Sequence, residues 1–147
     1  MAAGSERLML DTNAVSAFLK GLSPRLDAWV RKQRCCLSSI VVAEIRYDLE
    51  KLPQASSLKS LAEETIETLE ILPWSEACTR IYGRLRADLE RNGKPLAAMD
   101  LLIASHALSE GCALVTADQA FGNVAELSLG MRSGAGTPLR RTARLMA

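Results

Sequence analysis

The sequence predicts an α/β fold in which helices flank a central parallel sheet, and three observations support this. Short apolar runs alternate with longer segments of helical periodicity, and this rhythm indicates parallel strands covered on both faces. Hydrophobic residues make up 48% of the chain and charged residues 24%, as in ordinary globular domains. At 147 residues, with no internal repeat, the chain has the length of one domain.

Five short apolar segments have the composition of strands. They are residues 7–10, "CCLSSI" (35–40), "EILPW" (70–74), "CALVTAD" (112–118) and "ELSLG" (126–130). "CALVTAD" is the clearest of them, and Pro73 ends the third because proline lacks the amide hydrogen that a central strand donates. The last is the weakest candidate, because it is short and partly polar.

Five segments between these runs have apolar residues at helical spacing. They are residues 13–21, 41–52, 56–70, 76–93 and 96–111. The third should be amphipathic, with one apolar face made of Leu58, Leu61, Ala62, Ile66 and Leu69. Ser75 is placed to cap the fourth helix, and Gly93 and Gly111 are placed to end the last two.

Charge and cysteine content restrict the classes of protein. The formal net charge is +1, so a polyanionic partner has to be bound by local patches. No apolar run reaches membrane-spanning length and the first residues lack the core of a signal peptide, so we expect a cytoplasmic protein without membrane contact. Cys35, Cys36, Cys78 and Cys112 lack metal-clip spacing, and we expect buried thiols.

The C-terminal segment differs from the rest. We divide the chain into a domain at residues 1–130 and a basic tail at 131–147, which contains four arginines and no acid. Glycine, threonine and proline interrupt any helical or strand pattern there. The tail is typical of a disordered terminus, and the alternative is an arm that contacts nucleic acid.

Acidic residues follow two of the predicted strands. Asp11 comes directly after "LML", and Asp118 follows "ALVTA". Because ligands of open α/β sheets bind beyond the carboxyl ends of the strands, these two should meet at one edge. Glu44 lies early in the helix after the second strand, and Asp100 lies early in an apolar helix, among residues that rarely accompany an unpartnered acid. All four acids are therefore candidates for one site.

Each acid also has an ordinary structural explanation. Asp11 can cap the helix that begins near Asn13, and Asp100 can interact favourably with a helix dipole. Asp118 can be a turn residue and Glu44 a solvated helix acid. Four carboxylates at one edge would repel one another, however, and a hard divalent cation relieves that repulsion. Oxygen ligands without histidine or cysteine fit Mg²⁺ or Mn²⁺, which indicates metal-assisted hydrolysis of a phosphate ester.

Other polar and aromatic residues are weaker candidates for the functional site. The small polar residues beside the acids either hold a water or form caps and turns; they are Thr12, Asn13, Ser39 and Thr116. His106 lies six residues after Asp100, off its helical face, so a core or surface role is favoured over that of a general base. The large aromatics Trp29, Trp74 and Tyr82 are expected to be packing residues.

Four segments in order resemble the PIN-domain family, and in particular VapC-like toxins of type II toxin–antitoxin pairs. They are "MLDTNAVSAFLKG", "LSSIVVAEIRYDLEK", the stretch from "LPWSEACTR" to "AAMDLLIASHAL", and "ALVTADQAF". The resemblance spans residues 7–130. It departs from the family at "QAF" after Asp118, at Met99, and in the tail, but none of these departures removes an acid.

The resemblance implies a PIN-like fold with a central parallel sheet flanked by helices. It implies that Asp11, Glu44, Asp100 and Asp118 are catalytic and bind Mg²⁺ or Mn²⁺, with Asn13 and Thr116 as supporting polar residues. It further implies an endoribonuclease that cuts structured RNA, such as tRNA or rRNA, by attack of a metal-activated water. A VapB-like antitoxin and a homodimer are the expected partners, and the residues that contact nucleic acid are not identified.

Two other functions compete with the nuclease. One is a catalytically silent PIN-like subunit of an antitoxin-containing, DNA-binding complex, since a metal site does not define the substrate. The other is a phospho-acceptor receiver domain, which also has an acidic Mg²⁺ pocket. Receivers usually have paired acids after the first strand and a lysine after the fifth, whereas here one acid follows the first strand and no lysine follows Lys94.

Overall fold

The computed structural model describes residues 6–118, 121–122 and 129–130, so the predicted tail lies outside the described residues. The described residues form a five-stranded, all-parallel sheet in the order β3-β2-β1-β4-β5. The strands are β1 (Leu8–Leu10), β2 (Cys35–Ser38), β3 (Glu70–Leu72), β4 (Ala113–Val115) and β5 (Leu129–Gly130). The predicted α/β class and parallel sheet are confirmed.

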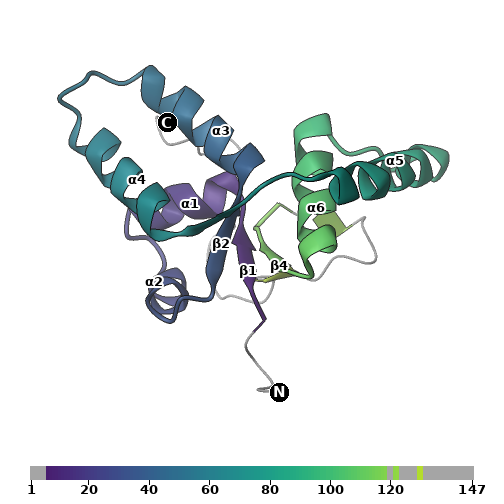
Figure 1. Ribbon diagram of the computed structural model, residues 1–147, viewed down its shortest axis with the longest axis horizontal. Coiled ribbons are helices and arrows are strands. Elements are labelled where there is room, and N and C mark those ends of the chain that lie inside the picture. The colour runs from purple at the N-terminus through teal and green to yellow at the C-terminus, as the bar shows by residue number, and fades with distance from the viewer. Residues whose placement is uncertain (1–5, 119–120, 123–128, 131–147) are drawn as a thin grey trace.

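Six helices connect and cover these strands. They are α1 (Thr12–Leu19), α2 (Pro24–Arg31), α3 (Ser39–Glu50), α4 (Ser57–Thr68), α5 (Glu76–Arg91) and α6 (Ala98–Glu110). In Figure 1, α1 to α4 lie to one side of the strands and α5 with α6 to the other. In the part of the chain that the structure describes, no helix combines the length and apolar character needed to cross a bilayer.

The core lies on the central strand β1, which pairs with β2 and β4. Leu8 is level with Cys35 on one side and with Ala113 on the other. Met9, Leu10 and Leu114 are fully buried, as expected for a parallel sheet covered on both faces. The chain turns out of this apolar layer at the carboxyl ends of β1 and β4, which is where Asp11 and Asp118 stand.

Helix α2 was not predicted, although its start has a recognisable sequence. Ser23 is the N-cap, where its side chain accepts a hydrogen bond from the backbone N–H of Leu26 at 3.2 Å. Pro24 follows at the first helical position, where its fixed φ and missing N–H cost nothing. Leu26 is the one fully buried residue of this helix, so its apolar periodicity is weak.

Three details of the other helices differ from the predictions. Helix α3 begins at Ser39, so Ser39 and Ile40 are helical and do not extend β2; Ser38 caps the helix. Leu61 was expected on the apolar face of α4, but it is 44% exposed. Ser75 occupies the N-cap position of α5 without a side-chain capping hydrogen bond, because its hydroxyl lies 3.7 Å from the Cys78 sulfur.

The predicted ends of α5 and α6 are confirmed. Gly93 and Gly111 have φ angles of 67° and 65°, in the left-handed region that residues with a Cβ atom adopt only at a cost. The four cysteines are all buried and none forms a disulfide, as predicted for a chain that uses them as small core residues.

Candidate active site

A cavity of about 520 Å³ opens beside the carboxyl ends of β1 and β4. Its lining comes from β1–α1, α3, α6 and the segment after β4, which the sheet order brings together. Five carboxylates line it, and we call it the acidic cavity: Asp11, Glu44, Asp48, Asp100 and Asp118. Among the described residues that line it there is no lysine, arginine or histidine. The structure therefore brings the four predicted acids together.

Asp11 is fixed at the sheet edge by three neighbours. Its backbone N–H donates to the Val115 carbonyl of β4 at 3.2 Å. Its carboxylate accepts from the Ala14 N–H at 2.7 Å, which makes Asp11 the N-cap of α1. The side chain of Thr116 also donates to this carboxylate. Its orientation is thus set by the fold itself.

The surroundings of Asp11 disfavour its charged form. Burial raises the pKa of this carboxyl from 3.8 to about 6, and the negative charges of Asp118 and Glu44 add to the increase. Hydrogen bonds from Thr116 and Ala14 oppose it without cancelling it. The acidic cavity therefore holds more negative charge than its own hydrogen bonds neutralise.

Asp118 and Thr116 are joined by a turn after β4. The backbone N–H of Asp118 donates to the Thr116 hydroxyl oxygen at 3.0 Å. Because Thr116 also donates to Asp11, one buried threonine connects the acids that follow the two neighbouring strands. Thr116 does not itself line the cavity, so its contribution is to orient these two acids.

The other two predicted acids reach the cavity from helices. Glu44 is half-buried on α3, where its carboxylate accepts from the Thr12 hydroxyl at 3.0 Å. Asp100 is the third residue of α6 and is 8% exposed, so the apolar residues around it keep it from solvent. Asn13, the predicted supporting residue on α1, is also 8% exposed and lines the cavity.

The side chains of the acidic cavity have the chemistry that a hard divalent cation prefers. All the charged groups of the acidic cavity are carboxylates, the ligands that Mg²⁺ and Mn²⁺ prefer. In the described part of the chain, no three histidine, cysteine, aspartate or glutamate side chains stand close enough together to form a ready-made metal cage. The carboxylates therefore share one cavity without forming a closed cage among the described residues.

Several residues that line the acidic cavity were not predicted, among them Asp48, Tyr47 and Met99. Asp48 lies one helical turn after Glu44, so the spacing of the two acids on α3 could have identified it. Tyr47 and Met99 also line the cavity, although both are exposed large side chains. Sequence alone does not distinguish such exposed apolar residues from ordinary surface residues.

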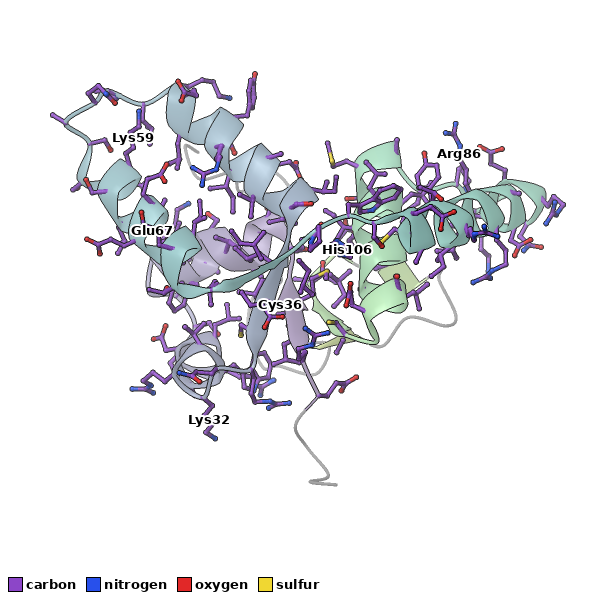
Figure 2. All side chains as sticks on the ribbon, viewed as in Figure 1. Lys32, Cys36, Lys59, Glu67, Arg86 and His106 are labelled. Atoms are coloured by element: carbon purple, nitrogen blue, oxygen red, sulfur yellow. The ribbon has the colours of Figure 1, made fainter. Side chains whose placement is uncertain are left out.

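His106 is a core residue, which is one of the two roles that the sequence favoured for it. It is fully buried, and its Nδ1 lies 2.7 Å from the Ser38 hydroxyl oxygen. Figure 2 shows it on α6, on the side that faces the strands. Burial lowers its pKa below the usual 6.5, against the raising effect of Glu110. Because it does not line the acidic cavity, it is not placed to exchange protons with a substrate there.

The predicted packing role of the aromatics agrees with their contacts. The Trp74 indole donates to the Leu102 carbonyl at 2.9 Å, and its ring meets Tyr82 edge-on with 6.3 Å between centroids. Trp29 is half-buried against the core, with the Arg25 guanidinium 5.9 Å from its ring centroid.

The chain resembles known proteins in both sequence and structure. The sequence pattern of the PIN domain matches residues 8–127. Ribonuclease VapC2 of Rickettsia felis is 37% identical over 112 residues, which cover 74% of this chain and 84% of the relative. The tRNA(fMet)-specific endonuclease VapC of Shigella flexneri is 30% identical over 112 residues, covering 75% of this chain and 85% of the relative.

Solved structures have a similar fold. VapBC2 from Rickettsia felis, bound to a DNA fragment of its promoter, contains a chain with a TM-score of 0.75 and 32% identity, and the match covers 84% of this chain and 96% of that one. DNA-bound VapBC from Salmonella typhimurium gives a TM-score of 0.77 at 29% identity, with 85% of this chain and 97% of that chain covered.

Proposed function

The chain belongs to the PIN-domain family as a nuclease of the VapC type, and we propose that it uses Mg²⁺ or Mn²⁺ to cut structured RNA. The observation that carries the proposal is the acidic cavity, in which four elements of the fold bring five carboxylates together without a lining cation. Such a charge distribution repels the phosphates of RNA unless a bound cation reverses its sign.

We assign the metal to Asp11, Asp100 and Asp118, with Glu44 as the fourth acid. When bound, a divalent cation supplies charge neutralisation at the scissile phosphate and a lowered pKa for the attacking water. The protein fixes the ligands. The helix cap and Thr116 hold Asp11, the turn after β4 holds Asp118, and Thr12 holds the Glu44 carboxylate. Asn13 is placed beside them as a neutral hydrogen-bonding group.

The residues of the acidic cavity favour direct hydrolysis. Among its described lining residues there is no cysteine or serine, and the Thr12 hydroxyl already donates to Glu44. A covalent intermediate would need a nucleophile next to a general base. Thr12 and Glu44 form a hydroxyl–carboxylate pair among these lining residues, and we assign this hydrogen bond to positioning Glu44, so that water is the proposed nucleophile.

The relatives support the wider biological role. The relative from Shigella flexneri is named for cleavage of tRNA(fMet), and the structures from Rickettsia and Salmonella are complexes of VapB with VapC. We propose that this chain is the toxin of such a pair, acts in the cytoplasm on tRNA or rRNA, forms a homodimer and is inhibited by a VapB-like antitoxin. Because those complexes contain DNA, a catalytically silent role in a DNA-binding complex is the second candidate.

Cleavage and metal binding should be measured separately. Purified wild type should cut total RNA or tRNA with Mg²⁺ or Mn²⁺ and stop when a chelator is added. Asp100→Asn should lose cleavage and show weaker Mn²⁺ binding by calorimetry. Glu67→Gln is the matched control, because Glu67 is an exposed acid on α4 outside the acidic cavity (Figure 2).

Two results would contradict the proposal. Undiminished cleavage by Asp100→Asn, or by wild type with excess chelator, would remove the metal from the mechanism. If wild type cuts no cellular RNA but binds promoter DNA together with the protein encoded next to it, the silent DNA-binding subunit becomes the better assignment.

A further inference from the structure

The mouth of the acidic cavity carries an exposed aromatic ring. Five large apolar side chains of the described residues are exposed, and two of them, Tyr47 and Met99, line this cavity. Tyr47 is 60% exposed and lies three residues after Glu44 on α3, on the same side of the helix. Leu22 is similarly exposed, at 63%, but lies outside the cavity.

An ion pair between the exposed Lys51 and the buried Asp48 lies beside this ring. The ammonium of Lys51 lies 4.3 Å from the centroid of the Tyr47 ring and 3.4 Å from an oxygen of Asp48. The Asp48 side chain is 4% exposed, so this end of the pair is fixed in the protein interior. Asp48 therefore positions Lys51, and Lys51 orients the tyrosine ring by a cation–π contact. The ring is held, yet most of its surface remains open to solvent.

The groups at the mouth match the parts of a nucleotide. An aromatic ring and the thioether of Met99 offer surfaces for a base, and the Lys51 ammonium is a partner for a backbone phosphate. The carboxylates deeper in the cavity are the proposed metal ligands for the neighbouring phosphate. A volume of about 520 Å³ lies within the range of sites that enclose a small organic group.

We propose that Tyr47 is a substrate-binding residue that stacks on an unpaired RNA base next to the scissile phosphate. The proposal rests on the proposed function, since it places the base beside the metal-binding carboxylates. A base within a duplex has to leave its stack before it can contact this ring, and an unpaired base does not pay that cost. The ring therefore favours a phosphodiester bond next to an unpaired base of the target RNA.

Binding can be measured apart from catalysis. The probes are a fluorescein-labelled single-stranded RNA decamer of mixed sequence and an abasic decamer with the same sugar–phosphate backbone. Both are titrated against wild type, Tyr47→Ala, Tyr47→Phe and Leu22→Ala with Ca²⁺ in place of Mg²⁺, so that the acidic cavity can hold a cation, and gel analysis checks that the decamers stay intact. Loss of one stacked base predicts about a 5- to 100-fold weaker affinity for Tyr47→Ala on the base-containing decamer. Tyr47→Phe keeps the ring, and Leu22→Ala is a matched exposed control, so both should stay within about twofold of wild type.

The abasic decamer isolates the stacking contact. It should bind wild type about as weakly as Tyr47→Ala binds the ordinary decamer, and Tyr47→Ala should weaken its binding no further. With Mg²⁺ or Mn²⁺ present, Tyr47→Ala should raise KM for a single-stranded substrate more than it lowers kcat. Because Tyr47 is exposed, the melting temperature of the variant should match that of wild type.

The results that would contradict the stacking role of Tyr47 differ from those that would contradict the proposed nuclease activity. If the protein cuts RNA but Tyr47→Ala leaves affinity and KM unchanged, the stacking role is wrong and the metal mechanism stands. The stacking role is also wrong if Tyr47→Ala weakens capture of the co-expressed partner protein alone, because the ring then belongs to a protein-binding surface. Failure of every form to cut RNA, with base-dependent binding intact, contradicts the catalytic proposal only.

Discussion

Replacing Asp11 by asparagine should stabilise the metal-free protein, although it removes a residue of the proposed active site. Asp11 is 6% exposed, and burial together with Asp118 and Glu44 raises the pKa of its carboxyl from 3.8 to about 6. At neutral pH its negative charge therefore opposes folding. Asparagine removes that charge and keeps the side-chain oxygen that accepts from Ala14, and the two residues are about equal as N-caps.

The size of the effect follows from the pKa difference. At about 1.4 kcal/mol for each pH unit, the change from 3.8 to about 6 corresponds to about 3 kcal/mol of unfolding free energy. That value already includes the hydrogen bonds from Ala14 and Thr116. The amide of asparagine has one acceptor oxygen where the carboxylate has two, so the bond from Thr116 is lost, which reduces the gain to about 1–2 kcal/mol. For a domain of this size that is about 3–8 °C in melting temperature.

The pH dependence distinguishes this explanation from a general packing effect. Because the folded-state pKa is raised, the folded chain binds the proton before the unfolded chain does as the pH falls. The penalty in wild type is therefore complete above about pH 6, decreases between about pH 6 and 4, and is absent below 3.8. The advantage of Asp11→Asn should decrease over the same range and disappear at about pH 5, below which the variant should be the less stable protein.

The assay is denaturant and thermal unfolding of wild type, Asp11→Asn and Asp11→Ala in chelator from pH 4 to 8. Asp11→Ala also removes the helix cap, so it should be about 1 kcal/mol less stable than Asp11→Asn at every pH. Mn²⁺ should then stabilise wild type and leave Asp11→Asn nearly unchanged. A variant that is less stable than wild type at pH 8, or a difference that does not vary with pH, refutes the reasoning.

Three further predictions concern residues outside the acidic cavity. Gly83 occupies an exposed helical position with open space around it, so Gly83→Ala should raise the unfolding free energy by up to about 1 kcal/mol. Gly111 has a φ of 65°, so Gly111→Ala should lower the unfolding free energy by about 1 kcal/mol. Chemical denaturation measures both changes. The imidazole of His106 should titrate below pH 6.5 by NMR, so its contribution to stability is lost as the pH falls below 6.5, where the unfolded chain takes up the proton first. The thiols of Cys36 and Cys112 should react with a disulfide reagent only after unfolding, because both are buried, and rapid labelling of native protein would contradict their burial.

The sequence predicted strands, and the acids that follow them, where a single pattern of apolar residues determines the local structure. The strands at Leu8–Leu10 and Ala113–Val115 are buried on both faces, so they appear as uninterrupted apolar runs. The acids that follow them are conspicuous because the chain leaves the core at those points. Because β1 and β4 pair in parallel, Asp11 and Asp118 lie at the same edge of the sheet. Sheet topology alone predicts this, without any knowledge of side-chain contacts.

Other features depend on contacts that are remote in sequence. Helix α2 buries one residue fully, so its apolar pattern is too weak to identify it, and its N-terminal Ser23–Pro24 pair was the remaining indication. Ser75 has the right residue type for a cap, but its hydroxyl lies next to Cys78. Asp48 was overlooked because a second acid on α3 looks like another solvated residue until the helix is placed against the cavity.

The two explanations of Asp11, a helix cap or a metal ligand, are compatible. A carboxylate has about four lone-pair positions, and the bond from Ala14 uses one of them. That bond and the one from Thr116 restrict the side chain to one orientation, which a metal ligand also needs. The cost is the raised pKa, because the same burial that holds the carboxylate also disfavours its charge. The N-cap of α1 therefore prepares Asp11 for a cation, and the cation offsets the instability that burial of the Asp11 carboxylate introduces.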